Sequence, residues 1–245
     1  MNNKLVPNVS KTKLMLITPR PAADLPDIFF DGSKLEWVSN MKYLGVVIDN
    51  KLNFSLQADE VYRKLSKMHG VFYSLSALMP QPTLLTLYYS LVYPIITQNI
   101  IIWGGVRAAN LNNIKTMINN ILRCILKVEY DEHNVPLMSA NKMYKSLNLL
   151  KFEDVYKYFL LKFLHYSMYT NTDFFNKYYL PLLPAHSYGT RGIKINLPSV
   201  RLEVEKQFAL FQSCKLVNEL PGNFLEPQSE HLLKSKYKKL ILSGY

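Results

Sequence analysis

The strongest constraint on the fold is a run of apolar residues at helical spacing that begins just after residue 50. Eight of them follow one another at steps of three or four residues: Phe54, Ala58, Val61, Leu65, Met68, Phe72, Leu75 and Met79. Such a stripe is typical of a single long helix that buries one face. Asn53 or Ser55 can cap its start, and Pro80 ends it. This helix therefore needs other apolar elements to cover it.

The sequence beyond Pro80 predicts more helices. Pro82 suits the first turn of a second helix, which runs to Gly104-Gly105 and should be kinked or interrupted at Pro94. A third amphipathic helix is predicted from Leu111 to Val128. Three further helical segments are expected near residues 152–169, 200–218 and 230–242.

The first fifty residues have the pattern of short strands and turns. Residues 13–18 read as one strand, and Asp31-Gly32 is a turn dipeptide between two hairpin strands. Residues 42–49 read as another strand, in which Gly45 marks a bulge or a close backbone approach. We therefore predict an α+β fold, with a small antiparallel β element followed by a mainly α-helical region.

The charge distribution points to an anionic partner. The formal net charge is +11, the sequence pI is about 9.4, and residues 51–245 carry 23 Lys and Arg against 13 Asp and Glu, which accounts for +10 of the total. Nucleic acid or a membrane surface would suit this charge, and a solvated basic surface without any partner explains it as well. Residues 84–103 are uncharged but include the adjacent polar pair Gln98-Asn99, so a buried helix is favoured over a membrane span.

The sequence lacks the motifs of the common metal, phosphate-binding and catalytic sites. Cys124 and Cys214 are the only cysteines, so neither a zinc site nor a disulfide framework is expected. There is no Asp-Asp pair, no Gly-rich phosphate loop and no nucleophile elbow. The start of the chain has no signal-peptide pattern, so we expect an intracellular protein, in the nucleus or the cytoplasm.

Five segments in order, across nearly the whole chain, carry a family resemblance. They are NKLVPNVSKTKLMLI (3–17), MKYLGVVIDNKLNF (41–54), LYYSLVYPII with IIWGG (87–105), HSYGTR (186–191) and VNELP (217–221). They resemble, respectively, the Asn-x-x-Lys-Thr palm segment, the Tyr-Leu-Gly primer grip, the thumb helix and two later landmarks of non-LTR retrotransposon reverse transcriptases of the LINE-type, Jockey-like group. The chain departs from that pattern at Pro7, at Gln98-Asn99 and at Val217, which stands in the usual place of Trp.

The resemblance implies three regions. Residues 1–50 would be a palm remnant with the primer-grip motif, residues 51–130 a thumb-like helical domain, and residues 131–245 a C-terminal helical region with a Pro/Gly-rich arm at 180–198. In that family Met1 would already lie inside the palm, so the fingers and both catalytic aspartate motifs would lie upstream. We therefore expect no polymerisation by this chain alone and no cofactor in it. Mg²⁺ is expected only for the full-length parent enzyme.

The resemblance also assigns candidate site residues. Lys11 matches the palm lysine near the phosphates of the incoming nucleotide, and Tyr43, Leu44 and Gly45 match the primer grip, where a tight turn approaches the primer. A surface lysine and ordinary strand packing are the alternatives.

Three basic residues of the first long helix, Arg63, Lys64 and Lys67, lie opposite or beside its apolar stripe, where they could contact phosphates without reading sequence. Arg191 could pair with a phosphate or with an acid. The alternative at these four positions is a solvated surface residue, and the pattern of charges favours it. The expected partner is an RNA/DNA duplex, bound without sequence preference. The alternative is a domesticated or decayed helical protein that binds another protein.

Overall fold

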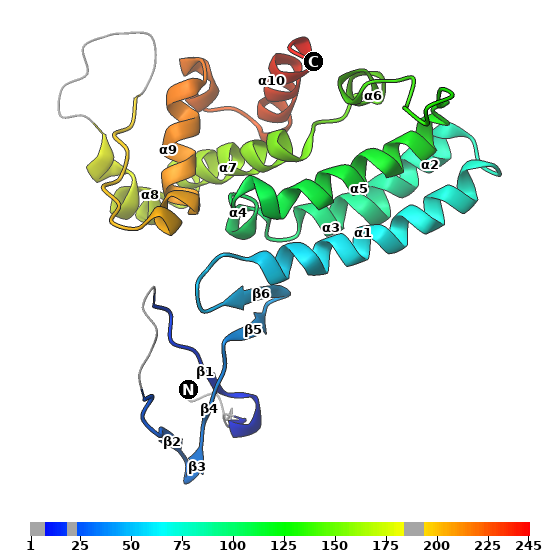
Figure 1. Cartoon of the computed structure of the whole chain (residues 1–245). Helices are drawn as coiled ribbons and strands as arrows, with labels where there is room; N and C mark the ends of the chain where they lie inside the picture. The colour runs from blue at the N-terminus through cyan, green and yellow to red at the C-terminus, as the bar shows by residue number, and fades with distance from the viewer. Residues whose placement is uncertain (1–7, 19–23, 184–193) are drawn as a thin grey trace, which may run out of the picture. The chain divides into compact units, whose positions relative to one another are not determined.

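The computed structural model describes residues 8–18, 24–183 and 194–245. The fold is α+β, as predicted, with small strand pairs near the N-terminus and helices through the rest (Figure 1). The chain forms two compact units, Met1–Gln57 and Ala58–Tyr245. Each unit is described by itself below.

The first unit contains short strand pairs. A 3-10 turn, η1 (Val9–Lys11), precedes β1 (Lys13–Leu14), which pairs in parallel with β4 (Glu36–Trp37). The strands β2 (Phe29–Phe30) and β3 (Ser33–Lys34) form an antiparallel hairpin. Its turn is Asp31-Gly32, as predicted, and both residues have positive φ angles of 50° and 72°. This backbone matches the tight hairpin turn that Asp-Gly favours.

The predicted strand at 42–49 is wrong in one respect, because the chain reverses in its middle. The strands β5 (Asn40–Tyr43) and β6 (Val46–Asp49) pair antiparallel, with Tyr43 opposite Val46. Leu44 and Gly45 form the two-residue turn, with φ angles of 46° and 86°. The predicted strand at 13–18 is also too long, because β1 comprises Lys13 and Leu14, which pair with β4.

A buried carboxylate shapes the loop between β6 and the first long helix. Asp49 is 7% exposed and accepts backbone N–H groups from Lys51 at 3.0 Å, Asn53 at 3.2 Å and Phe54 at 2.7 Å. Leu52 and Phe54 have left-handed φ angles of 53° and 52°, a costly conformation for bulky residues. The hydrogen bonds to Asp49 offset this cost and stabilise the turn that precedes the helix.

The helices that the apolar stripe and Pro82 predicted begin at the end of the first unit and continue in the second. They are α1 (Ser55–Ser76), α2 (Gln81–Leu87), the π-helical segment η2 (Tyr88–Val92), α3 (Tyr93–Thr97) and α4 (Ile100–Trp103). Pro94 lies in the first turn of α3, directly after the π-helical turn, as expected for a residue that has no N–H to donate. The helix then breaks at Asn99, whose φ of 52° is left-handed.

The remaining helices lie between Ala108 and Ser243. They are α5 (Ala108–Leu126), α6 (Ala140–Ser146), α7 (Phe152–Tyr169), α8 (Thr172–Tyr178), η3 (Leu180–Leu182), η4 (Glu203–Gln207), α9 (Ala209–Glu219), η5 (Gly222–Leu225) and α10 (Glu230–Ser243). The helix α7 contacts α3, α4, α8, α9 and α10, while α5 contacts α2 and α6 (Figure 1). Because α7 buries both aromatic and aliphatic residues along its length, it forms the centre of the core.

The Pro/Gly-rich arm is described only at its two ends, because residues 184–193 lie outside the described part of the chain. Its start forms η3, and beyond the gap the backbone N–H of Asn196 donates to the carbonyl of Leu182 at 2.8 Å. Ile195 is buried at 2% exposure. Across residues 8–18, 24–183 and 194–245, no helix combines the length and apolarity that a membrane crossing requires.

Candidate nucleic-acid interface

The helix α1 separates an apolar face from a basic one. Leu65 and Phe72 are fully buried on the first face. Arg63 and Lys67 are exposed on the opposite face, one helical turn apart, which places their Cβ atoms about 5–6 Å from each other. Gly70 and Ser74 continue this face toward the end of the helix. We call these four residues the basic stripe.

The three predicted cations of α1 differ in how closely an acidic side chain lies beside them. Lys64 lies at the flank of the stripe and forms an ion pair with Glu60 at 3.1 Å. The exposed Asp59 precedes Arg63 by one turn, and its backbone carbonyl accepts a long hydrogen bond of 3.4 Å from Arg63 Nε. The charge of Lys64 is thus partly compensated by Glu60, so Arg63 and Lys67 dominate the field of this face.

The structure brings the three predicted cations together. Arg63, Lys64 and Lys67 border one shallow depression of about 520 Å³, together with Glu60, Tyr62 and Ser66. The depression is formed by a single helix, so its shape follows directly from residue spacing. An open basic depression of this kind can take a phosphate group without enclosing it.

Gly70 leaves the basic stripe flat. A Cβ atom at this position would meet no atom within 4 Å, so nothing in the packing of the helix requires glycine here. The backbone carbonyl of Gly70 accepts a hydrogen bond from Ser74 Oγ at 3.2 Å. Glycine costs about 1 kcal/mol inside a helix relative to alanine, and its effect here is to leave the stripe unobstructed.

The residues matched to the primer grip lie at a hairpin tip in the first unit. Leu44 and Gly45 are the turn itself, and the side chains of Tyr43 and Leu44 are 58% and 77% exposed. The turn therefore presents two large apolar side chains to its surroundings. Lys11 is exposed at the end of η1 in the same unit. Arg191, which also has a predicted role, lies outside the described residues, as do His186 and Tyr188 of the same motif.

The Trp-Gly-Gly landmark has a packing role. Trp103 is fully buried, its Nε1–H donates to the carbonyl of Gln98 at 2.9 Å, and its ring packs against Phe152 at 5.7 Å between centroids. A Cβ atom on Gly105 would lie 2.4 Å from the hydroxyl of Tyr156 and 2.6 Å from the carbonyl of Gln207. The glycine is therefore required for the close approach of α7.

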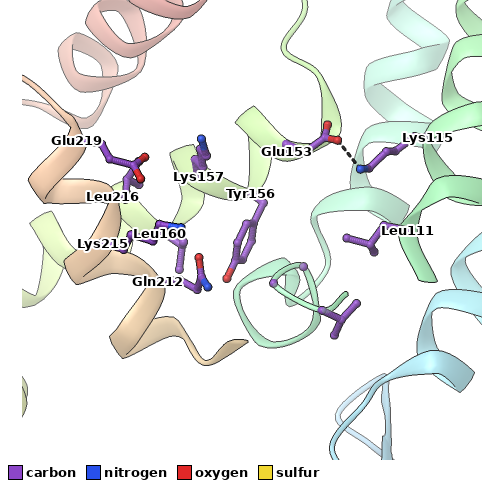
Figure 2. Close-up of a pocket in the computed structure, with 13 residues that line it drawn as sticks. Leu111, Lys115, Glu153, Tyr156, Lys157, Leu160, Gln212, Lys215, Leu216 and Glu219 are labelled. Carbon is purple, nitrogen blue, oxygen red and sulfur yellow. Dashed lines mark ion pairs between the residues drawn. The ribbon is translucent and has the colours of Figure 1, made fainter. Parts of the chain in front are cut away.

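A cleft of about 230 Å³ lies beside this contact, between α5, α7 and α9 (Figure 2). Lys115 of α5 and Glu153 of α7 form an ion pair on one wall, and Lys215 and Glu219 of α9 line the other. Burial raises the pKa of the Tyr156 phenol, so this hydroxyl stays neutral. Charges of both signs line the cleft, in contrast to the basic stripe.

Two further cations were not singled out from the sequence. Arg123 and Lys127 lie one turn apart at the end of α5, and both line a hollow that α1 also borders. Their spacing of four residues was the only available signal, and many solvated helices share it. Among the described residues, no group of three or more His, Cys, Asp or Glu side chains could hold a metal ion.

Comparisons with known proteins identify no relative. No family model matches the chain, and no match was found among curated proteins or solved structures.

Proposed function

We propose that this chain binds RNA/DNA duplexes through their phosphates, without reading base sequence, as the C-terminal part of a LINE-type, Jockey-like reverse transcriptase. The observation that carries the proposal is the basic stripe, where Arg63 and Lys67 lie exposed on the face opposite the buried side of α1. The ordered motifs from residue 3 to residue 221 supply the family assignment. Binding alone is proposed, because the family's catalytic aspartate motifs have no counterpart in the chain.

Duplex binding through such a face is electrostatic. A nucleic acid duplex carries about one negative charge per 1.7 Å of its axis, and each neutralised phosphate releases counterions. Two cations one turn apart on a rigid helix can contact neighbouring phosphates, while the missing side chain at Gly70 lets the backbone of the duplex approach. Because phosphates carry no sequence information, such binding is expected to be tolerant of sequence.

The test is fluorescence anisotropy with a blunt RNA/DNA hybrid over a series of salt concentrations. We expect binding whose affinity falls steeply with salt. Replacing both Arg63 and Lys67 by alanine should weaken binding to all sequences alike and reduce the log–log salt slope by about 2, or about 1 for each phosphate contact. A hybrid that does not bind, or binding insensitive to salt, would overturn the proposal.

A charge-matched control separates the stripe from the general basic charge of the chain. Lys234 and Lys239 are exposed on α10, so replacing both by alanine removes the same two charges elsewhere. We expect this control to bind the hybrid almost as well as the unaltered chain. A third variant should bind the hybrid more tightly than the unaltered chain: Asp59→Asn removes the negative charge one turn before Arg63. Equal losses in the stripe variant and in the α10 control would contradict a role for α1.

A second candidate function, binding of a protein partner, is favoured by the apolar hairpin tip. Tyr43 and Leu44 expose most of their side chains there, so the hairpin tip offers apolar surface to a partner. A Leu44→Asp variant distinguishes the two functions. Loss of a partner in pull-down experiments, with hybrid binding unchanged, would support the protein-binding function.

A further inference from the structure

A second basic surface lies on another side of α1. The end of α5 and the second half of α1 enclose a hollow of about 520 Å³, which we call the α1–α5 hollow. Its chemistry comes from three basic side chains, two tyrosines and a thiol: His69, Tyr73, Arg123, Cys124, Lys127 and Tyr130. All of them belong to the second unit. Tyr73 lies about a quarter turn away from the basic stripe around the helix axis, so the two surfaces are distinct.

The charged residues that line the hollow, Arg123 and Lys127, are both cationic. No Asp or Glu occurs among its described lining residues. Asp131 follows Tyr130 in the chain, but its carboxylate accepts the backbone N–H groups of His133 at 2.9 Å and Val135 at 2.7 Å. The Asp131 carboxylate therefore stabilises the turn at residues 131–135. Arg123 donates through Nη1 to Asn120 Oδ1 at 2.6 Å, so this guanidinium is held in place by a neutral partner and keeps its charge uncompensated within the hollow.

Two aromatic rings border the cations. Tyr73 is 70% exposed and Tyr130 is 49% exposed, so both side chains are open to solvent. Exposed rings beside arginine and lysine are the combination that binds single-stranded nucleic acid, because every base has a flat face that can stack on a phenol. The volume of the hollow falls within the range of sites for compact organic ligands, which is about 300–1,000 Å³.

We propose that the α1–α5 hollow holds an unpaired nucleotide of a single strand of RNA or DNA, with its base against Tyr73 or Tyr130 and its phosphate against Arg123 and Lys127. The inference rests on the proposed nucleic-acid function, but a separate set of residues carries it. The basic stripe offers cations beside one ring, that of Tyr62, which is less exposed than Tyr73 or Tyr130, and it suits a paired backbone. The hollow adds the rings that an unstacked base requires, so the chain would bind a duplex and an adjoining unpaired strand with different faces of α1.

The test compares two probes on the full chain, a single-stranded oligonucleotide of mixed sequence and the blunt RNA/DNA hybrid. Replacing Tyr73 and Tyr130 together by alanine should weaken single-strand binding by roughly tenfold to a hundredfold, as expected for the loss of base stacking. Binding of the blunt hybrid should change by less than about twofold, since phosphate contacts by the stripe remain. The Arg63→Ala, Lys67→Ala double variant should lose more affinity for the hybrid than for the single strand.

Two controls test the stacking itself. Replacing the same tyrosines by phenylalanine keeps both rings and should preserve single-strand binding, so an equal loss with phenylalanine would overturn stacking. Tyr166 is 52% exposed on α7, away from the hollow, and Tyr166→Ala should leave both affinities unchanged. Because all three positions are exposed, these variants should fold.

Cys124 supplies a direct readout of occupancy. Its thiol lines the hollow and is partly exposed, whereas Cys214 is fully buried. Burial raises the pKa of both thiols, that of Cys214 to about 11, so the difference in exposure separates them. Alkylation of the folded chain therefore reports Cys124. Saturating oligonucleotide should slow this alkylation several-fold, while the hybrid should not.

The outcomes separate the two proposals. Single-strand binding with no effect of the tyrosine variants, or without protection of Cys124, would overturn the hollow and leave duplex binding by the basic stripe intact. Binding of neither probe would overturn both. Hollow-dependent binding of the single strand together with no binding of the hybrid would retain the hollow as a nucleic-acid site and reject the duplex function.

Discussion

The side-chain amide of Asn218 holds the backbone of Ile195 at both of its polar groups. Asn218 Oδ1 accepts the N–H of Ile195 at 3.0 Å, and Asn218 Nδ2 donates to its carbonyl at 2.8 Å. Asn218 belongs to the VNELP landmark, and Ile195 follows the segment that contains HSYGTR. One landmark thus fixes the chain directly after the other, and Ile195 is buried beside α9 as a result.

We expect Asn218→Ala to lower the free energy of unfolding by about 1–2 kcal/mol, because two backbone hydrogen bonds are lost at a partly exposed site. Urea denaturation followed by circular dichroism measures the change. Asn113, which is exposed on α5, provides the control, since Asn113→Ala should be neutral or slightly stabilising. Equal unfolding midpoints for Asn218→Ala and the unaltered chain would show that the two hydrogen bonds to Ile195 do not contribute to stability.

Replacing Gly70 or Gly105 by alanine should change the free energy of unfolding in opposite directions. Gly70→Ala should raise the free energy of unfolding by about 0.5–1 kcal/mol, because a Cβ there meets nothing within 4 Å and alanine favours the helix. Gly105→Ala should lower it by about 1–3 kcal/mol, because the new Cβ would overlap Tyr156 and the Gln207 carbonyl. Thermal unfolding of the two variants side by side tests the pair. Shifts of the same sign would contradict the packing described for the Trp-Gly-Gly landmark.

The loop before α1 should depend on Asp49. Asp49→Ala removes an acceptor for three backbone N–H groups and should destabilise the loop locally by about 2–4 kcal/mol, since hydrogen bonds to a charged partner are the stronger ones. Hydrogen exchange at the amide of Phe54 should accelerate accordingly. Asp27→Asn is the control, because the ion pair of Asp27 with Lys34 at 2.6 Å is exposed and should contribute little. Unchanged exchange at Phe54 would argue against this role for Asp49.

High pH should unfold the second unit through its buried phenols. Burial raises the pKa of Tyr88, Tyr144 and Tyr237 above the value of about 10 that a phenol has in the unfolded chain. The folded form therefore keeps protons that the unfolded form releases. The stabilisation is fully present below pH about 10 and is lost as pH rises further, by about 1.4 kcal/mol per pH unit for each such phenol.

Urea unfolding at a series of pH values above 9, with tyrosinate absorbance as a second signal, measures this loss. Tyr88→Phe removes one ionisable group and should make the dependence on pH shallower. An unfolding free energy that stays constant between about pH 9 and 11 would contradict the burial of these hydroxyls.

Most of the helices follow from the sequence because their signals are local. The apolar stripe of α1, the boundaries of α7 and the Asp31-Gly32 turn each depend on residues a few positions apart, and each was predicted. The clustering of Arg63, Lys64 and Lys67 on one surface is equally local, since one helix carries all three. The short helices α6 and α8 were not placed in advance, because seven residues carry too little periodicity to distinguish them from loops.

Tertiary structure decided what depends on residues that are distant in the sequence. The turn at Leu44-Gly45 was read as part of a strand, because Leu44 shows no preference for a left-handed φ until β5 and β6 pair across it. The amide of Asn218 meets Ile195 only when α9 packs beside the end of the arm, and Tyr73 and Tyr130 line one hollow only when the end of α5 lies beside the end of α1. Spacing along the chain determines which face of a helix a residue occupies. Only the packing of helices determines which faces share a surface, because that choice minimises exposed apolar area over the whole unit at once.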